Sequence, residues 1–312
     1  MRQFWSISAR VLVAQCTLAA ALTASAAADE VTLEDNALLV AFDSQSGALT
    51  RLEDKSGHWT IERRPELGVS FRLFAPLPER RWNPVLGQKQ VASEVTKVSD
   101  HEVRLRWKNL ASETGGVLPI TLTATVALTN GVLTFNSTLQ NDSALTVETI
   151  DYPYFGDFNA PARSSSLAAC VMRGGKPGNL QTDELYPHFR NEHGYWGDFF
   201  PLKTLEAQQS PFCLIQSPDE GVYVSVGGDN VPYRLQYTFE QHPGVVSSID
   251  SLVPQEDSIA GTPVHLEVRT CHFVFAGPHS TTNLVPIALQ CYQGTSKDGV
   301  NLYNQRRSTL NQ

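Results

Sequence analysis

Residues 118–143 read LPITLTATVALTNGVLTFNSTLQNDS. Apolar and polar side chains alternate through both halves of this stretch, and β-branched residues are frequent. Strict alternation is typical of strands that bury one face in a core. The central Thr-Asn-Gly, residues 129–131, has the composition of a tight hairpin turn. The stretch therefore predicts two long antiparallel strands.

The same alternation recurs along most of the chain. Further segments of this kind are 31–43, 48–55, 94–110, 145–155, 221–229, 233–241 and 263–277. Short connectors rich in Gly, Asn or Asp separate several of them, as in hairpins. The best candidate for a helix is 280–297, and Pro286 predicts that this helix begins near that residue. We expect a single all-β domain from 29 to 312, built as a sandwich of large antiparallel sheets.

The first 28 residues have the features of a secretory signal peptide. Arg2 and Arg10 accompany an apolar run that is too short to cross a bilayer, and small residues up to Ala26 and Ala28 suit cleavage. No other segment approaches the roughly 20 apolar residues of a membrane span. We therefore expect a secreted or periplasmic protein with no membrane span.

The charge balance of the chain is acidic. The full sequence holds 24 Lys and Arg against 32 Asp and Glu, a net charge of −8, and loss of the two leader arginines makes it −10. An acidic chain is not drawn to phosphate backbones or to anionic lipids. The balance argues against nucleic acid as a partner and is compatible with a neutral sugar.

Four cysteines follow the leader: Cys170, Cys213, Cys271 and Cys291. In an oxidising compartment they could form up to two disulfides, with three connectivities if all pair, and the sequence does not choose among them. Their spacings do not match a zinc site, and no phosphate-loop or nucleophile-elbow motif is present. We expect neither a metal nor a cofactor.

One region, at about 156–204, interrupts the strand pattern. Its most unusual part, residues 184–200, reads ELYPHFRNEHGYWGDFF. A connection this long within a compact domain is often functional. Aromatic rings suit the C–H face of a pyranose, and polar side chains suit its hydroxyls. We predict a loop whose sugar contacts come from Tyr186, Arg190, Asn191, Tyr195 and Trp196.

The same segment holds the candidates for acid–base chemistry, which needs two titratable groups with well-separated pKa values. These candidates are His188, Glu192, His193 and Asp198. A partner could come from strands elsewhere, because residues two apart on a strand share a face. Glu240 with His242, and His265 with Glu267, are two such pairs. In a purely structural alternative, the rings plug the open end of the sandwich and the charges lie in solvent.

Three groups of residues resemble one known family. Asp43, Gly47, Leu49 and Leu52 form the pattern D-x-x-x-G-x-L-x-x-L, which is similar to the start of galactose-mutarotase-like β-supersandwich domains. Asn141, Ser143, Pro153 and Gly156 resemble a second signature of these domains. The segment 195–230 resembles a third, in which a Tyr-x-Gly loop leads into two strands.

The resemblance implies a supersandwich fold, as found in sugar mutarotases and in the N-terminal modules of multidomain glycoside hydrolases. In mutarotases a His acts as general acid beside a carboxylate base. Asn191, His193, Tyr195 and Trp196 are similar to its surroundings, with Glu192 as an extra residue. In the hydrolases a catalytic barrel would follow near residue 300.

Two functions are compatible with these observations. The first is an exported carbohydrate-binding protein or module related to the N-terminal domain of glycoside hydrolases, whose aromatic loop could also dock a catalytic domain. The second is a carbohydrate-active enzyme, a glycoside hydrolase, epimerase or lyase, with a His and carboxylate acid–base pair. We favour binding, because stacking residues are in excess in 184–200 and no carboxylate pair stands out.

Overall fold

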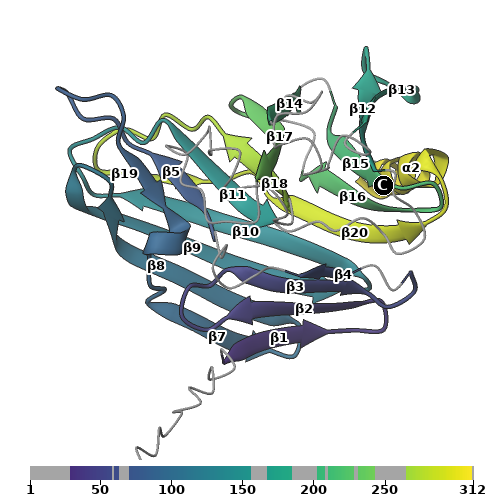
Figure 1. Ribbon diagram of the computed structural model, residues 1–312, viewed down its shortest axis with the longest axis horizontal. Coiled ribbons are helices and arrows are strands. Elements are labelled where there is room, and N and C mark those ends of the chain that lie inside the picture. Colours follow the sequence, from purple (N-terminus) through teal and green to yellow (C-terminus); the bar gives the residue numbers. More distant parts are fainter. Residues whose placement is uncertain are drawn as a thin grey trace, which may run out of the picture.

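The computed structural model describes residues 29–57, 60–62, 70–155, 167–184, 202–207, 210–227, 231–242 and 265–310. In these residues the chain forms antiparallel strands, arranged in three sheets, and a C-terminal helix (Figure 1). The predicted all-β sandwich of large antiparallel sheets is confirmed. The leader, residues 1–28, lies outside the described residues, as does most of the long connection at 156–204. The expectation that this connection is a continuous loop is wrong, because residues 168–173, 176–184 and 202–206 form strands that pair with their neighbours in the sheets.

The largest sheet contains ten strands. Nine of them follow the order β13-β12-β15-β16-β20-β10-β9-β8-β7, and β19 also pairs with β10. The hairpin predicted at 118–143 is β9 and β10, which pair from Thr129 with Val132 to Ile120 with Asn141. The strands of this sheet are β7 (Glu94–Ser99), β8 (Glu102–Ser112), β9 (Gly116–Thr129), β10 (Val132–Asn141), β12 (Ala168–Arg173), β13 (Lys176–Glu184), β15 (Phe212–Gln216), β16 (Glu220–Val226), β19 (Ser280–Asn283) and β20 (Ile287–Gln293).

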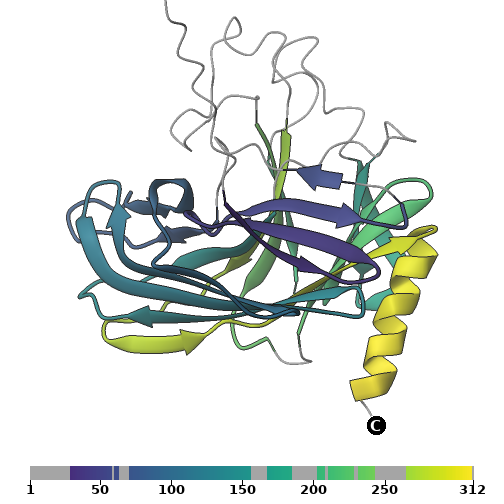
Figure 2. The ribbon, with the colours of Figure 1, turned by 90° about the horizontal axis from the view of Figure 1, so that it is seen from below.

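Two smaller sheets complete the sandwich. The four-stranded sheet follows chain order: β1 (Glu30–Glu34), β2 (Leu38–Asp43), β3 (Leu49–Asp54) and β4 (Thr60–Glu62). The order in the six-stranded sheet is β14 (Leu202–Glu206), β17 (Leu235–His242), β18 (His265–His272), β11 (Thr149–Phe155), β5 (Arg72–Phe74) and β6 (Pro84–Leu86), after which the 3₁₀ turn η2 spans Gly87–Lys89. In Figure 2 strands β1–β3 form a layer over the large sheet, and the helix lies at one end.

Trp107 of β8 lies at the centre of the core and is fully buried. Its ring makes edge contacts with Phe71, which precedes β5, and with Tyr152 of β11, at centroid distances of 5.1 and 6.4 Å. The indole N–H donates to the Ser46 carbonyl at 2.8 Å. One side chain of the large sheet therefore contacts both smaller sheets or the turns beside them.

The Asp43 and Gly47 pattern is a turn that closes over this tryptophan. The Asp43 carboxylate accepts from the backbone N–H of Ser46 at 2.6 Å and from its hydroxyl at 2.7 Å. Gly47 has φ +68°, which disfavours a side chain, and a Cβ there would lie 2.6 Å from the Trp107 ring. The glycine is required by both backbone conformation and space.

The predicted helix at 280–297 is wrong. Residues 280–293 form β19 and β20, which pair with β10 and β16, and the helix α2 spans Ser296–Leu310. A short apolar run fits a buried strand as well as a helix, and pairing with neighbouring strands decides here. The helix begins with one half of a capping box, because the Asp298 carboxylate accepts from the N–H of Thr295 at 2.8 Å and from its hydroxyl at 3.2 Å.

Helix α2 packs on the large sheet through aromatic and guanidinium contacts. The rings of Tyr303 and Phe212 lie 5.2 Å apart, and the Arg306 guanidinium lies 5.2 Å from the centroid of Tyr223. Arg306 also donates to the Ser225 hydroxyl at 2.8 Å. The helix therefore covers the outer side of β15 and β16, where apolar side chains would otherwise face solvent.

All four cysteines beyond the leader are free thiols. Cys170 packs with Met172 and Phe212 in the outer cluster under α2, whereas Cys213 packs in the main core. Burial raises the pKa of both thiols. Cys170 and Cys213 lie on neighbouring strands but belong to different apolar clusters.

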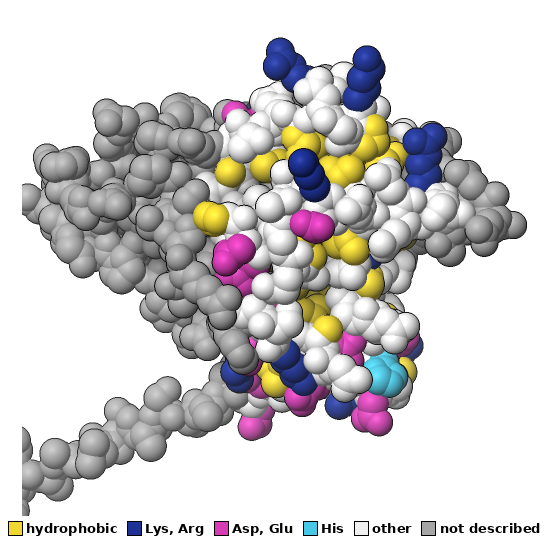
Figure 3. Space-filling view, turned by 90° about the vertical axis from the view of Figure 1, so that its right-hand side faces the viewer, with side chains coloured by type: hydrophobic (Ala, Val, Ile, Leu, Met, Phe, Trp, Pro, Cys, Tyr) yellow, Lys and Arg dark blue, Asp and Glu magenta, His cyan; other side chains and the backbone are white. Residues whose placement is uncertain are grey.

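The charges on one side of the molecule are mixed. Viewed from the right of Figure 1, Lys and Arg side chains project at the upper end, while Asp and Glu lie in the middle and at the lower end, where some basic side chains join them (Figure 3). Hydrophobic side chains appear as separate patches. The described part of this side therefore presents no field of a single sign.

Among the described residues, no helix combines the length and hydropathy needed to cross a membrane.

The Gly47 turn leads to a stability prediction. Gly47→Ala should lower the free energy of unfolding by about 2–4 kcal/mol, because the cost of a left-handed backbone at a residue with a side chain adds to the cost of a clash with Trp107. Gly116 is the matched control, since it has the same φ of +68° and no atom lies within 4 Å of the point that a Cβ would occupy. Gly116→Ala should cost only about 1 kcal/mol. Urea unfolding measures both, and equal losses would contradict the packing argument.

Candidate functional site

The nine site residues predicted in 184–200 lie outside the described residues. The candidates for acid–base chemistry are His188, Glu192, His193 and Asp198, and those for sugar contact are Tyr186, Arg190, Asn191, Tyr195 and Trp196. Their roles stay predictions, as does docking of a catalytic domain through this segment.

The candidate pairs on the strands are brought together. β17 and β18 are antiparallel neighbours, and their register places Glu240 opposite Glu267 and His242 opposite His265. Residues directly opposite on neighbouring strands are about 5 Å apart. The two pairs, predicted separately, thus occupy one end of the same two-stranded unit.

The outward face of the six-stranded sheet carries buried polar side chains. On β18, Val268 points into the main core, whereas Glu267 and Arg269 occupy the alternate positions on the other face. Both are only 4% exposed. Charged groups are rarely this buried unless they are paired.

Asp151 of β11 pairs with two arginines. Its Oδ2 lies 2.7 Å from Nε of Arg72 on β5 and 3.1 Å from Nε of Arg269 on β18. Asp151 is 3% exposed. The carboxylate therefore links three neighbouring strands through buried ion pairs.

Tyr154 connects this cluster to the second carboxylate. Its hydroxyl donates to Oε2 of Glu267 at 2.5 Å, and Nη1 of Arg269 lies 3.5 Å from the same hydroxyl. The Arg269 guanidinium lies 5.6 Å from the centroid of the tyrosine ring. We name these five residues the polar network: Arg72, Asp151, Tyr154, Glu267 and Arg269. Its two guanidinium groups and two carboxylates have formal charges that cancel.

A β-bulge puts both β11 members of the network on one face. Asp151 is opposite Cys271 and Tyr154 is opposite Arg269, so two residues of β11 face one residue of β18. These two residues are Tyr152 and Pro153, which together oppose Thr270. Without the bulge, residues three apart on a strand would point to opposite faces.

A buried histidine on the opposite face is structural. His272 Nε2 lies 2.7 Å from the carbonyl oxygen of Tyr152, and its Nδ1 lies 3.0 Å from the hydroxyl of Tyr233. Burial lowers the pKa of His272 to about 4, although the bond to the Tyr152 carbonyl raises it. The ring is therefore neutral at pH 7 and fixes β11 to β18 from the core side.

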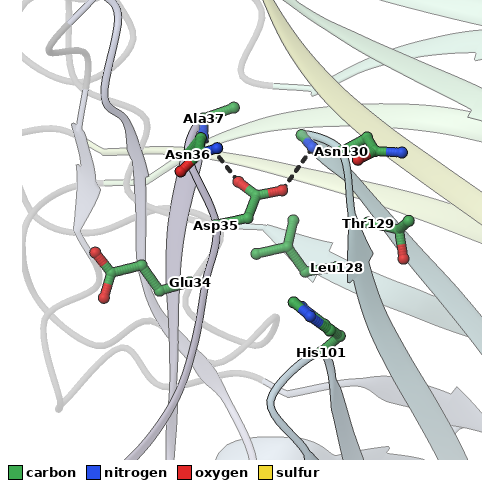
Figure 4. Close-up of a pocket in the computed structure, with 9 residues that line it drawn as sticks. Glu34, Asp35, Asn36, Ala37, His101, Leu128, Thr129 and Asn130 are labelled. Carbon is green, nitrogen blue, oxygen red and sulfur yellow. Dashed lines mark hydrogen bonds between the residues drawn. The ribbon is translucent and has the colours of Figure 1, made fainter.

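A separate pocket of about 540 Å³ lies where three turns meet (Figure 4). Glu34, Asp35, His101, Leu128 and Asn130 are among the residues that line it. The Asp35 carboxylate extends towards the Thr-Asn-Gly turn. It accepts from the N–H groups of Ala37, Leu38 and Gly131 at 2.8, 2.9 and 2.6 Å. Asp35 thus fastens the β1–β2 turn to the β9–β10 turn, which is a structural role.

The described residues contain no group of three or more His, Cys, Asp or Glu side chains placed to hold a metal ion. The polar network holds only two acidic groups, and both are engaged by arginine or tyrosine.

Comparison with known proteins identifies the fold. No protein-family model matches the chain, and no curated protein matches its sequence. Among solved structures it is similar to an Escherichia coli K12 protein assigned as an aldose 1-epimerase, with TM-score 0.52 and 12% identity over 85% of this chain and 99% of that one. The fold is galactose-mutarotase-like. A galactose mutarotase-like protein from Lactobacillus casei ATCC 334 is similar as well, with TM-score 0.50 and 14% identity over 85% of this chain and all of that one.

The mutarotase-like fold predicted from the sequence is thus confirmed, whereas four members of the polar network were missed. Of these five residues only Glu267 was a candidate. Arg72 and Asp151 each interrupt a stretch that is otherwise mostly apolar, and that is the signal that could have found them. Arg269 lies in a strand of mixed composition and has no such signal. Tyr154 has no comparable signal in the sequence.

The backbone hydrogen bonds that the Asp35 carboxylate accepts predict that stability depends on pH. Burial raises the Asp35 pKa, but three backbone hydrogen bonds and the charge of Lys55 outweigh it, so the pKa is lowered overall. A lowered pKa means that the stabilisation is complete above the unfolded value of about 3.9. It is lost as the pH falls through the lower folded value.

Asp35→Asn should therefore lose about 1–2 kcal/mol at pH 7, because one backbone N–H would face an amide N–H. The variant should also lose less stability than the wild type on acidification below pH 4. The control is Asp142→Asn at an exposed carboxylate that accepts one bond from Gln140. Chemical unfolding at pH 7 and pH 3 tests this prediction. Equal losses of unfolding free energy in the two variants would argue against a stabilising role of the hydrogen bonds to Asp35.

Proposed function

We propose that this protein is an exported carbohydrate-binding protein whose ligand binds at the polar network of the six-stranded sheet. The observation that supports this most directly is the gathering of two arginines, two carboxylates and a tyrosine on one face, linked at 2.5–3.5 Å. A sheet packed only for stability would be expected to bury apolar side chains there, because buried ion pairs contribute little net stability.

The chemistry of the network fits a neutral sugar. Each sugar hydroxyl both donates and accepts, so recognition calls for fixed donors beside fixed acceptors. Arginine supplies several donors in a rigid plane, and carboxylates supply paired acceptors. Because the formal charges of these five residues cancel, they offer directional hydrogen bonds without a net charge of their own.

The open end of the network is at Arg72. Its side chain is 21% exposed, whereas those of Asp151 and Arg269 are 4% exposed. A ligand that approaches from this end would meet Arg72 first. The sugar contacts predicted for the aromatic segment 184–200 remain part of this proposal.

One further observation favours carbohydrate as the ligand class, and another supports export. The fold is similar to that of a protein assigned as an aldose 1-epimerase, so related scaffolds are associated with sugars. Export is inferred from the leader, with its basic start and its small residues before Asp29.

A second candidate function is catalysis at the anomeric centre of a sugar. The observation in its favour is the Tyr154 hydroxyl held 2.5 Å from the Glu267 carboxylate. Opening of the sugar ring needs a base that removes the proton of the anomeric hydroxyl and an acid that protonates the ring oxygen as its bond to the anomeric carbon breaks. Glu267 would act as the base, and Tyr154 would position it. Glu240, His242 and His265, at the same end of β17 and β18, are the positions from which an acid could come.

Binding is tested with Arg72→Gln. We expect wild-type protein to bind one or more neutral sugars in a panel of monosaccharides and oligosaccharides, measured by calorimetry. The variant should bind at least tenfold more weakly, because the guanidinium donors at the open end are lost. It should stay folded, because Asp151 keeps its ion pair with Arg269. Arg104→Gln, on β8 of the large sheet, should bind as the wild type does. No binding by the wild type to any sugar would overturn the proposal.

Catalysis is tested with Glu267→Gln, in which the amide oxygen can still accept from Tyr154. If the protein is an enzyme, wild type should accelerate the mutarotation of α-D-glucose or α-D-galactose in a polarimeter. The variant should lose at least a hundredfold in rate while it still binds sugar. Glu94→Gln in β7 is the control and should keep full activity. Binding without any acceleration by the wild type would leave the binding function and exclude mutarotation of these sugars.

A further inference from the structure

A group of aromatic and charged side chains, some half-buried and some exposed, lies beside the open end of the polar network. The ring of Phe74 at the end of β5 lies 5.5 Å from that of Trp82, and the Arg81 guanidinium lies 5.9 Å from the Phe74 centroid. Arg81 donates to both oxygens of Glu148, at 3.1 and 2.7 Å. We name these four residues the aromatic platform.

The platform continues the face that carries the network. Arg72 and Phe74 are two residues apart on β5, and the residue between them, Leu73, is buried in the main core. Both side chains therefore point away from the core, about 7 Å apart. β5 and β11 are neighbours in the sheet, and Glu148 directly precedes β11 (Figure 1). A ligand at Arg72 thus has the Phe74 ring as its next neighbour along the strand.

Hydrogen bonds of a buried side chain fix the base of the loop that carries the platform. Asn83, which follows Trp82, is fully buried. Its Nδ2 donates to the Ala75 carbonyl at 2.9 Å, and its Oδ1 accepts from the N–H groups of Thr114 and Gly115 at 3.1 and 3.0 Å. The loop 75–83 is therefore closed at its base, while Trp82 keeps 37% of its surface exposed. Because the loop is already fixed, binding of a ligand to the exposed Trp82 ring should cost little further conformational entropy.

A strained residue lies next to the platform. Phe275 has φ +44°, which is unusual for a bulky residue, and its side chain is 60% exposed. Its backbone N–H donates to the Glu148 carbonyl at 3.2 Å. The next residue, Ala276, exchanges two backbone hydrogen bonds with Val147, so this local pairing holds the exposed Phe275 ring beside Glu148. Strain of this kind is concentrated at ligand sites.

We propose that the aromatic platform is a second sugar subsite, which binds the next residue of a neutral oligosaccharide whose first residue lies at the polar network. The inference rests on the proposed function. Trp82 and Phe74 offer apolar faces to the C–H side of a pyranose ring. The Arg81 and Glu148 pair offers donors and acceptors for hydroxyls and carries no net charge, so it suits a neutral sugar. The preferred ligand is then at least a disaccharide.

The test compares matched monosaccharides and oligosaccharides on the same protein by calorimetry. Wild type should bind the disaccharide or trisaccharide at least tenfold more tightly than its terminal monosaccharide. Trp82→Ala should remove this gain and leave the monosaccharide affinity unchanged, and Trp82→Phe should keep part of the gain. Arg81→Gln, whose native side chain is 74% exposed, is a second variant that does not disturb packing and should also reduce the gain.

The controls separate this subsite from the site at the network. Val98→Ala changes an exposed apolar side chain of β7 and should leave both affinities unchanged. Arg72→Gln should weaken monosaccharide and oligosaccharide alike. Equal affinities of Trp82→Ala, Arg81→Gln and wild type for the oligosaccharide would overturn the subsite and leave the network site standing. If the wild type binds no saccharide, both proposals fail.

Discussion

The contact between the Trp107 indole and the Gly47 turn is the constraint on which the other layers depend. The turn leaves room for the ring only because residue 47 has no side chain, and the indole N–H bonds to the carbonyl just before it. Phe71 and Tyr152 contact the same ring, and they lead into β5 and β11. The strands that carry the polar network are thus positioned from the core by the residue that fixes the four-stranded sheet.

Different interactions stabilise the two faces of the six-stranded sheet. Towards the core, apolar side chains and the neutral His272 stabilise the layer through burial and two hydrogen bonds. On the outer face the buried groups are charged, and their desolvation cost is offset only while every partner is in place. A face of this kind is costly to maintain for stability alone, which is why it is a reasonable place to look for function.

The sequence predicted the elements that have one face in the core, because β8, β9 and β10 alternate between apolar and polar residues. It did not locate the polar network, because Asp151 is a single charged residue in β11 and the sequence does not show which residues of β5 and β18 lie beside it. The pairing of Glu240 with Glu267 depends on how β17 and β18 meet, which is a property of topology. The misplaced helix has a similar cause, because Ile287–Gln293 is apolar enough for either structure until its neighbours in the sheet are known.

The bulge in β11 limits how this segment can change in length. Two residues between Asp151 and Tyr154 oppose a single residue of β18. Removal of one of them would restore regular alternation and reverse the orientation of every side chain on one side of the deletion. Either Asp151 would turn into the core with its charge, or Tyr154 and Phe155 would exchange faces. Substitutions here can be absorbed one at a time, but a single-residue deletion would invert one half of the strand, so homologues that keep this face should keep the spacing between these two positions.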